Sequence, residues 1–481
     1  MLEDKRTAIA RQAARLFLES GYEATSMKQL ADATGMAHPG IYHYFRSKED
    51  LLENIHRQAA WVLNESLIPG LRGGDAPRQK IERLIETTAA LLAGSDEIRL
   101  LLLQARVPKR IARRAEAGAK EVIGLLRGVL KDLFRCHPLA EPVDATVAAF
   151  SLVGMTSWIA RWYKSDGRLG LDQLTGALKR LFLYGYYGGE VGDVEEEGGL
   201  PELPAEASLA GEKKELIARK TADLFSKRGY ENATMQQIAR AAGTSASGLY
   251  HYFRNKEEIL LSLYDIGATL FDRCCLQEAA RVEDAEVKIR LHIRNVLHLL
   301  TSHKEVSLFL LEDSSPKAVR KSADETARSF VRSLRADLVR LAAEKGLRDP
   351  VDPTVAAFSL VGMISWTLRW YDPNGPLDLR ALSGHVTRLF LNGVTAGGAG
   401  SPSEALLGEV PGRRSPGRLA ETATVAGGRC PSCGRVYYPK REGCLYCPEE
   451  GLEEVELIFE LPASLNAALL DDYRSRTRGG H

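Results

Sequence analysis

The opening segment of the chain alternates apolar and polar residues with the spacing of an amphipathic helix. Its apolar face is formed by Ile9, Ala13, Leu16 and Phe17. Gly21 is a natural stop for this helix, and the Ser26 hydroxyl can cap the free amides of a second, shorter run that ends near Gly35. A third helix is predicted to begin around residues 37–39, where proline is tolerated in the first turn, and to end near Phe45. The pattern therefore predicts three helices in close succession.

A longer helix is predicted to follow these three. Ser47 with Asp50, and Asn255 with Glu258 further along the chain, have the spacing of helix start signals. The two short helices before it are joined by a turn at Gly35, which predicts a helix-turn-helix. This arrangement places its second helix in the major groove of DNA, so the segment has the pattern of a duplex-binding unit.

The same pattern occurs twice, at an offset of 208 residues. Residues 41–49 return as residues 249–257, and residues 150–163 return as residues 358–371 with the same glycine, tryptophan and arginine positions. A period this long exceeds any solenoid repeat, so each copy is a whole domain of ordinary size. We interpret the chain as two protomers fused head to tail, an internal pseudo-dimer that is monomeric as a chain.

Composition excludes several classes of protein. The chain has 481 residues, of which 44% are hydrophobic and 26% are charged, so it can bury two or three cores and is neither disordered nor fibrous. Charged residues occur among the first apolar ones, and no apolar run approaches the length of a membrane span, so a cytoplasmic protein without membrane contact is expected. The net charge of +1 does not identify a partner. Cys136, Cys274 and Cys275 are expected to be buried apolar fillers.

Both duplex-binding segments share residues with a known family. In the first copy these are Gly21, Tyr22, Glu23, Ser26, Met27, Leu30, Ala31, Gly35, residues 42–45, Lys48 and Glu49. In the second copy they are Gly229, Tyr230, Glu231, Thr234, Met235, Ile238, Ala239, Gly243, residues 250–253, Lys256 and Glu257. Each segment resembles the N-terminal DNA-binding domain of the TetR/AcrR family of transcriptional regulators. The resemblance implies an all-α fold of two TetR-like units, each with a helix-turn-helix and a helical ligand-binding and dimerisation domain, whose last two long helices form a four-helix interface.

Hydroxyls and amides at the starts of the second and third helices, together with Tyr42 and Lys48, are donors that can meet phosphate oxygens. The resemblance implies that outward residues of the third helix approach base edges or backbone, whereas Tyr44 and Phe45 are better explained as packing residues. The candidate DNA-binding residues of the first copy are Ser26, His38, Pro39, Gly40, Tyr42, His43 and Lys48. Those of the second copy are Thr234, Ser245, Ala246, Ser247, Tyr250, His251 and Lys256.

The two recognition helices differ at the positions that face DNA. Residues 36–40 read Met-Ala-His-Pro-Gly, whereas residues 244–248 read Thr-Ser-Ala-Ser-Gly. Ala37 also lacks the hydroxyl that Ser245 offers as a helix cap. A symmetric dimer presents identical helices to a palindrome, because half-site symmetry mirrors protein symmetry. The sequence therefore favours an asymmetric operator.

Each copy carries a tryptophan and arginine cluster at helical spacing. The clusters are Trp158, Arg161 and Trp162, and Trp366, Arg369 and Trp370. They lie on one side of a helix and fit either an aromatic interface ridge or an effector site. This segment resembles TetR regulators of fatty-acid and sterol catabolism that respond to acyl-CoA thioesters. The resemblance implies an apolar tunnel for the acyl chain, with Arg161 and Arg369 as cations for the phosphates.

Two Cys-x-x-Cys pairs lie near the C-terminus. They consist of Cys430, Cys433, Cys444 and Cys447. Four thiolates at this spacing can close a tetrahedral site around one structural zinc ion, with iron as the main rival. The segment resembles the rubredoxin-like zinc ribbon that precedes an OB fold in proteins associated with acyl-CoA thiolases and hydratases, and the match is expected to cover the ribbon alone. Alternation over residues 455–461 predicts a strand, and a short helix is predicted near residues 465–473.

These observations divide the chain into seven segments. The helix-turn-helix domains are predicted at 1–50 and 212–258, the helical ligand-binding and dimerisation domains at 51–188 and 259–395, the linkers at 189–211 and 396–428, and the zinc ribbon with its tail at 429–481.

Two functions remain open on these residues. The first is a ligand-responsive repressor, in which the two non-identical recognition helices read two half-sites of a double-stranded operator and a small apolar or acyl-CoA effector releases it. The second is an accessory or scaffold protein of an acyl-CoA-metabolising enzyme, acting through its ribbon. No nucleophile motif, phosphate-cradling glycine loop or open metal site points to an enzyme, and His43 and His251 are better explained as recognition-helix residues than as general bases.

Overall fold

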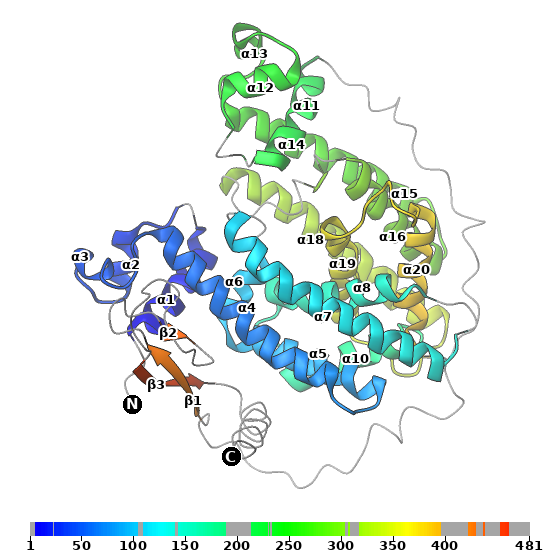
Figure 1. Ribbon diagram of the computed structural model, residues 1–481. Helices are drawn as coiled ribbons and strands as arrows, with labels where there is room; N and C mark the ends of the chain where they lie inside the picture. The colour runs from blue at the N-terminus through cyan, green and yellow to red at the C-terminus, as the bar shows by residue number, and fades with distance from the viewer. Residues whose placement is uncertain are drawn as a thin grey trace. The chain divides into compact units, whose positions relative to one another are not determined.

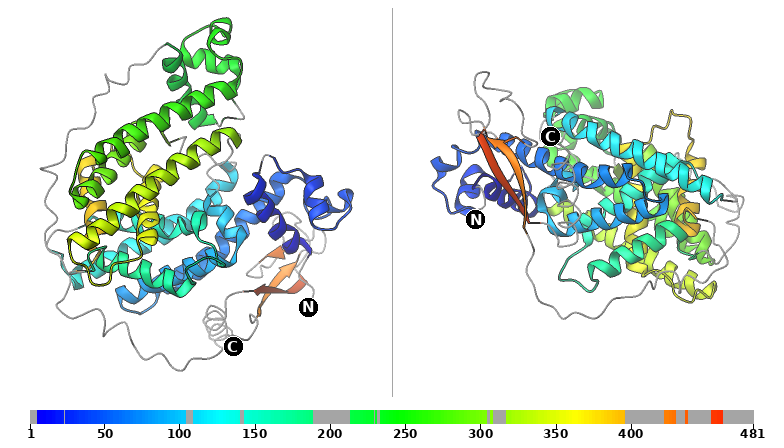
Figure 2. Two further views of the ribbon diagram at one scale, coloured as in Figure 1. Left: turned by 180° about the vertical axis from the view of Figure 1, so that it is seen from behind. Right: turned by 60° about the horizontal axis from the view of Figure 1, so that its bottom comes forward.

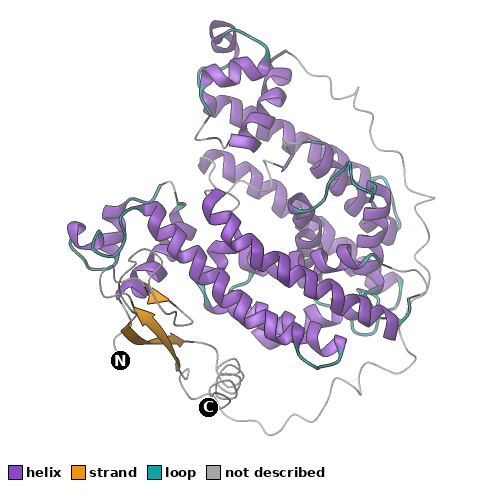
Figure 3. Ribbon diagram, viewed as in Figure 1, coloured by secondary structure: helices purple, strands orange, loops and turns teal. Residues whose placement is uncertain are grey.

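The computed structural model describes a defined part of the chain. The described residues are 5–22, 24–103, 109–139, 143–188, 213–228, 230, 233–303, 306–307, 317–395, 422–429, 436–437 and 453–460. They fall into two compact units, one of residues 10–400 and one that joins residues 1–9 to residues 401–481. Figures 1 and 3 show helices in the first unit and a small sheet in the second.

Two helical copies make up residues 10–400, and the first helix of the first copy begins a few residues earlier, at Lys5. The helices of the first copy are α1 (Lys5–Ser20), α2 (Met27–Ala33), α3 (His38–Ile41), α4 (Lys48–Arg72), α5 (Pro77–Gly94), α6 (Asp96–Leu103), α7 (Lys109–Cys136), α8 (Ala145–Ser157), α9 (Ile159–Trp162) and α10 (Leu171–Tyr184). Those of the second are α11 (Lys213–Arg228), α12 (Met235–Ala242), α13 (Ala246–Tyr252), α14 (Lys256–Phe271), the π-helix η2 (Asp272–Gln277), α15 (Glu278–Ala280), α16 (Ala285–Ser302), α18 (Lys317–Glu344), α19 (Pro353–Ser365), the 3₁₀-helix η3 (Trp366–Arg369) and α20 (Leu379–Asn392). The expected all-α class with a small C-terminal ribbon is confirmed.

The predicted helix signals occupy the predicted positions. Gly21, Gly35 and Gly243 have positive φ angles of 87°, 66° and 70°, which glycine adopts without the steric cost of a side chain, so each allows a sharp turn after a helix. The third helix of the first copy is shorter than predicted, because α3 ends at Ile41 rather than near Phe45. Ala37 provides no side-chain cap, whereas Ser245 caps the longer α13, which has a glycine at the position of Gly40 as well. The missing cap therefore accounts for the short helix.

The two copies meet along α8 and α19, which pack against each other (Figures 1 and 2). Both helices are apolar around their whole circumference, which suits helices buried on every side. At their crossing, a Cβ on Gly362 would lie 2.6 Å from the Gly154 carbonyl oxygen and 2.7 Å from the Trp158 Cβ. A Cβ on Gly154 would meet the Gly362 carbonyl oxygen at 2.5 Å. Only glycine at both positions allows the two backbones to approach this closely.

The ends of α10 and α20 join the copies a second time through backbone hydrogen bonds. The amides of Tyr186 and Tyr187 donate to the carbonyls of Phe390 and Leu391 at 2.8 and 2.9 Å, and the Thr395 amide donates to the Leu183 carbonyl at 2.9 Å. The exchange is reciprocal, as expected of two protomers related by an approximate two-fold axis.

Side chains extend this second contact. The Tyr186 hydroxyl donates to the Leu338 carbonyl at 2.9 Å, and the Tyr187 hydroxyl donates to Glu286 Oε2 at 2.6 Å. Burial raises the pKa of both phenols well above its ordinary value, which is already high enough to keep a phenol a protonated donor at neutral pH. The first copy therefore holds α16 and α18 of the second as well as α19 and α20.

The second unit contains a three-stranded antiparallel sheet in the order β2-β1-β3. Its strands are β1 (Thr422–Arg429), β2 (Val436–Tyr437) and β3 (Glu453–Glu460). Thr422 pairs with Glu460 and Gly428 with Tyr437. The strand predicted at residues 455–461 corresponds to β3, whereas the four ribbon cysteines and the short helix predicted near 465–473 lie outside the described residues.

Two of the three cysteines expected to be apolar fillers are buried. Cys274 and Cys275 are 4% and 1% exposed, and burial raises the pKa of both thiols. The expectation is wrong for Cys136, which is exposed at the end of α7, because the last turn of a helix need not lie against the core. Among the described residues, no helix is long and apolar enough to cross a membrane.

We expect Gly362→Ala to lower the free energy of unfolding by about 1–3 kcal/mol, because the added methyl group overpacks the α8–α19 crossing. Gly124→Ala on α7 is the control. A Cβ on Gly124 meets nothing within 4 Å, so this change should raise stability by roughly 0.5–1 kcal/mol through helix propensity. Urea unfolding followed by circular dichroism measures both, and equal stability of Gly362→Ala and the unmodified protein would contradict the close crossing.

Candidate nucleic-acid interface

The second helix of each DNA-binding domain begins at a side-chain cap. Ser26 Oγ accepts from the Gln29 amide at 3.2 Å, and the Gln29 side chain returns the contact to the Ser26 amide at 2.7 Å. Thr234 and Gln237 form the same capping box at 3.3 and 3.2 Å. Both hydroxyls are exposed but already occupied by helix amides. They therefore set the helix start, and their predicted phosphate contacts remain predictions.

The recognition helices α3 and α13 present their predicted residues to the surface. Tyr42 and Tyr250 are 44% and 54% exposed, which is unusual for aromatic side chains in an otherwise packed domain. The other exposed candidates are His38, Pro39, His43, Ser245, Ala246, Ser247 and His251, and Gly40 is half-buried. Ile41 and Leu249 are fully buried and anchor each helix to its domain. The exposed set has the composition of a polar surface that can contact a duplex.

The packing role predicted for Tyr44 and Phe45 agrees with their burial, since Phe45 is fully buried and Tyr44 is half-buried. Their counterparts Tyr252 and Phe253 behave in the same way. These aromatic residues hold the recognition helix against its domain, whereas Tyr42 and Tyr250 stay exposed.

The caps of the two recognition helices differ as predicted. Ser245 Oγ accepts from the Gly248 amide at 3.0 Å and lies 3.1 Å from Ser247 Oγ. Ala37 at the same position of the first copy makes no side-chain cap. A serine cap typically stabilises a helix by about 1 kcal/mol, so α13 is the better-formed recognition helix and runs to Tyr252.

Lys48 and Lys256 have a structural role that sequence reasoning missed. Lys48 Nζ donates to the Tyr22 carbonyl at 2.7 Å and lies 4.3 Å from the Tyr22 ring centroid. Lys256 repeats this contact with Tyr230 at 3.1 and 4.4 Å. Each lysine ties the start of the long fourth helix to the turn after the first helix. Their contact with phosphate remains a prediction.

Further basic side chains lie exposed beside the recognition helices. Lys28 on α2 and Arg240 on α12 are exposed, and so are Arg46 and Arg254 just after α3 and α13. Their sequence signal was available, since each occupies an outward position of a helix-turn-helix. The helices α2 and α12 do not carry the same charges. Gln236 of α12 stands at the position of Lys28, and Asp32 of α2 stands at the position of Arg240.

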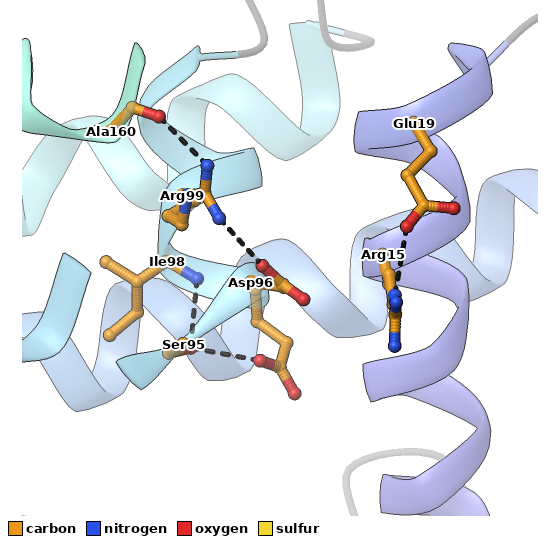
Figure 4. Close-up of polar contacts among 8 residues, drawn as sticks. Arg15, Glu19, Ser95, Asp96, Ile98, Arg99 and Ala160 are labelled. Atoms are coloured by element: carbon orange, nitrogen blue, oxygen red, sulfur yellow. Dashed lines mark hydrogen bonds and ion pairs between the residues drawn. The ribbon is translucent and has the colours of Figure 1, made fainter. Parts of the chain in front are cut away.

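The helix α6 connects the first DNA-binding domain to the interface between the copies. Arg11 on α1 lies 3.8 Å from Glu97 on α6. Arg99 on α6 donates to the Ala160 carbonyl at 3.2 Å and pairs with Asp96 at 3.2 Å (Figure 4). Figure 4 also shows Arg15 beside Glu19 on α1. A displacement of α6 would therefore change its contacts with both α1 and α9.

The second copy reaches the same helix. Arg369 Nη2 donates to the Leu102 carbonyl of α6 at 3.2 Å, a contact between residues 267 positions apart. This side-chain to carbonyl bond gives Arg369 a structural role at the interface between the copies.

The tryptophan and arginine clusters lie at the interface between the copies. Trp162 stacks on Phe358 of the other copy at 4.9 Å between ring centroids, and Trp370 stacks on Phe150 at 4.7 Å. Arg161 and Arg369 lie over the rings of Trp158 and Trp366 at 4.9 and 4.4 Å. These contacts fit the predicted aromatic ridge. Effector contact by these six residues stays a prediction.

A cavity of about 320 Å³ lies between α10 of the first copy and the start of α19 in the second. Its polar side includes Asp352, which pairs with Arg168 at 2.6 Å. Burial alone would raise the pKa of Asp352, but hydrogen bonds from Arg168 and from the Val355 and Thr354 amides lower it below its ordinary value. The equivalent position of the cavity residue Ala177 is His385, so a larger side chain stands at the matching place of the other copy.

No cluster of three histidine, cysteine or acidic side chains arranged for a metal occurs in the described part of the chain. The four ribbon cysteines lie outside that part.

Two exposed helix-turn-helix domains, each attached to a packed helical domain, define a DNA-binding protein of the helix-turn-helix class. Comparison with family models agrees. Residues 9–55 and 217–263 match the tetR family of bacterial regulatory proteins, and residues 74–186 and 282–394 match the tetracyclin repressor-like C-terminal domain. Residues 425–453 match the rubredoxin-like zinc ribbon domain of ChsH2. The chain belongs to the TetR family as a tandem of two complete units with a C-terminal zinc ribbon domain.

Individual relatives match one unit at a time. The HTH-type transcriptional repressor KstR2 of Rhodococcus jostii is 27% identical over 190 residues, which cover 38% of this chain and 90% of KstR2. The fatty acid metabolism regulator protein of Bacillus subtilis is 24% identical over 180 residues, which cover 36% and 92%. The solved structure of AibR in complex with isovaleryl coenzyme A and operator DNA is 31% identical, with a TM-score of 0.35, and covers 37% of this chain and 98% of AibR.

Proposed function

We propose that this protein is a ligand-responsive transcriptional repressor in which one chain reads a whole operator. The observation that carries the proposal is the presence of two exposed but different recognition helices, α3 and α13, in a chain whose copies are joined through α8 and α19. A symmetric family member needs two chains to present two helices, whereas this chain supplies both. This chain matches 90% and 84% of the length of two relatives that are named as KstR2 repressors, which supports this role.

Release from DNA requires the two recognition helices to leave groove spacing, which is roughly 34–36 Å between half-sites. The contacts of α6 provide a physical connection for this change. The helix contacts α1 through Glu97, α9 through Arg99 and the second copy through Leu102. An effector that binds one arrangement of α6 more tightly shifts the population between bound and released states. We infer that effector binding in the helical domains moves α6 and, with it, α1.

We propose an acyl-CoA thioester as the effector class. The name of the Bacillus subtilis relative, fatty acid metabolism regulator protein, supports an apolar acyl ligand. The guanidinium groups of Arg161 and Arg369 are of the chemical type that binds CoA phosphates, and each lies over a tryptophan ring. The tryptophans supply apolar surface beside them.

Selection of the full-length protein against random duplex DNA is expected to return an operator with two different half-sites. Binding should weaken as salt concentration rises, because phosphate contacts release counterions. The matched variant replaces residues 244–247 with Met-Ala-His-Pro, the sequence of residues 36–39. In this variant both recognition helices begin with the same four residues, so the selected site should shift toward a palindrome. A palindrome selected by the unmodified protein would contradict the asymmetric operator, and no selected site at all would contradict the repressor.

Titration of the selected complex with a series of acyl-CoAs is expected to release the DNA with at least one chain length. The expected weakening is about tenfold or more, a coupling free energy of about 1.4 kcal/mol. Fluorescence anisotropy of labelled operator measures it, with free CoA and the matching fatty acid as controls. If no acyl-CoA changes the operator affinity, this effector class is wrong and the DNA-binding role is unaffected.

We propose that the C-terminal segment holds one structural zinc ion. The match of residues 425–453 to a zinc ribbon supports this, and the donor set of Cys430, Cys433, Cys444 and Cys447 suits a closed tetrahedral zinc site without an open position for water. The four thiolates would hold the ion and fix the fold of the ribbon.

Elemental analysis of the purified protein is expected to find one zinc per chain. The variant Cys444→Ser should lose this zinc, because three thiolates no longer close the site. Cys136→Ser is the control, since that exposed thiol lies on α7 and should leave the zinc content unchanged. Iron in place of zinc, or zinc retained by Cys444→Ser, would overturn the assignment.

A further inference from the structure

The interior of the second helical domain contains a buried polar pair. His292 on α16 is fully buried, and its Nε2 lies 3.1 Å from Asp337 Oδ2 on α18. Asp337 is 7% exposed, and its other oxygen lies 3.7 Å from Lys288 Nζ. A buried carboxylate is tolerated when it is paired and hydrogen-bonded, and here both partners come from α16.

The first copy has no such pair at the matching positions. At an offset of 208 residues, Leu84 replaces His292 and Val129 replaces Asp337, while Lys80 is retained at the position of Lys288. Leu84 and Val129 are buried, with exposures of 5% and 6%. The same place in the fold is therefore apolar in one copy and polar in the other.

The second nitrogen of His292 has no hydrogen-bond partner among the described residues. Since the Asp337 carboxylate can only accept, the proton of a neutral imidazole lies on Nε2, and Nδ1 presents a lone pair. A buried acceptor without a donor is costly, so a ligand group that donates to Nδ1 would be stabilised there. The aromatic surroundings indicate a mostly apolar ligand, because the His292 ring meets Phe330 edge-on at 5.2 Å and Phe330 meets Phe271 at 5.0 Å.

A change of backbone geometry accompanies the pair. After α14, the chain of the second copy forms the π-helix η2, which packs against α16 and α18. Asn295 on α16 donates to the Cys274 carbonyl inside η2 at 2.5 Å. The first copy has Thr87 and Ser66 at these positions, and α4 continues there as a regular α-helix. Short π-helical segments are frequent at functional sites, because they redirect backbone and side chains locally.

We propose that the helical domain of the second copy binds a mostly apolar ligand that carries a hydroxyl group, which donates its hydrogen bond to His292 Nδ1. Asp337 fixes the tautomer and orientation of the ring, and Phe271 and Phe330 face the hydrocarbon part. The first copy, with Leu84 and Val129, does not distinguish such a ligand from one without the hydroxyl. The inference rests on the proposed function and names a class of ligand for the helical domain of the second copy.

The test is calorimetric titration of the full-length, DNA-free protein with primary alcohols from hexanol to dodecanol and with the methyl ether of each alcohol. The ether keeps the chain and the oxygen but has no proton to donate. At least one alcohol is expected to bind at one site per chain with about tenfold higher affinity than its ether, because the ether leaves Nδ1 unsatisfied.

The matched variant is His292→Leu combined with Asp337→Val, which installs the residues of the first copy without leaving an unpaired carboxylate. It should fold, as judged by circular dichroism, and should lose the preference for alcohol over ether. Leu84→Met in the first copy is the control and should keep the preference.

Three results would overturn the site: equal affinity of the unmodified protein for alcohol and ether, a preference that survives in the double variant, or no binding of any alcohol in the series. Because the titration contains no DNA, these results concern the hydroxyl site alone. Failure to select an operator would instead overturn the proposed repressor while leaving the titration valid.

Discussion

The contact between Gly154 and Gly362 determines how the two copies can sit together. Side chains are absent at the point where α8 crosses α19, so the helices approach until backbone meets backbone. This approach brings Trp162 onto Phe358 and Trp370 onto Phe150, in two stacks that repeat each other across the interface. The close crossing also agrees with the exchange of backbone hydrogen bonds after α10 and α20. The interface thus resembles a dimer interface in its symmetry, although a single chain forms both sides.

Fusion removes a constraint that a symmetric dimer obeys. In a homodimer every substitution appears twice, so both recognition helices and both interiors stay identical. In this chain the copies have diverged at separate places with different consequences. Ser245 caps a recognition helix whose counterpart has Ala37, and His385 stands where the other copy has Ala177 beside a cavity. The divergent positions lie on the exposed recognition helices, in the interior and at one side of the interface, whereas the helix framework between them is retained.

Local chemistry made much of the fold predictable. Caps such as Ser26 and Thr234 depend on residues three positions away, and the repeat is visible in the sequence itself. Contacts between distant residues were not predictable in the same way. The bond from Arg369 to the Leu102 carbonyl and the glycine crossing depend on how two copies dock, which no local pattern encodes. The short α3 is an intermediate case, because the missing cap at Ala37 was visible in the sequence but its effect on helix length was not. The exposed Cys136 shows that residue type alone does not settle burial.

We propose that one chain provides both halves of a DNA-binding unit. The most direct test is the mass of the complex between the full-length protein and its selected operator, determined by native mass spectrometry or sedimentation velocity over a range of protein concentrations. We expect one chain per operator duplex, with a stoichiometry that does not rise when protein is in moderate excess. Two chains per duplex at the lowest concentration that binds, with no complex of a single chain, would contradict it.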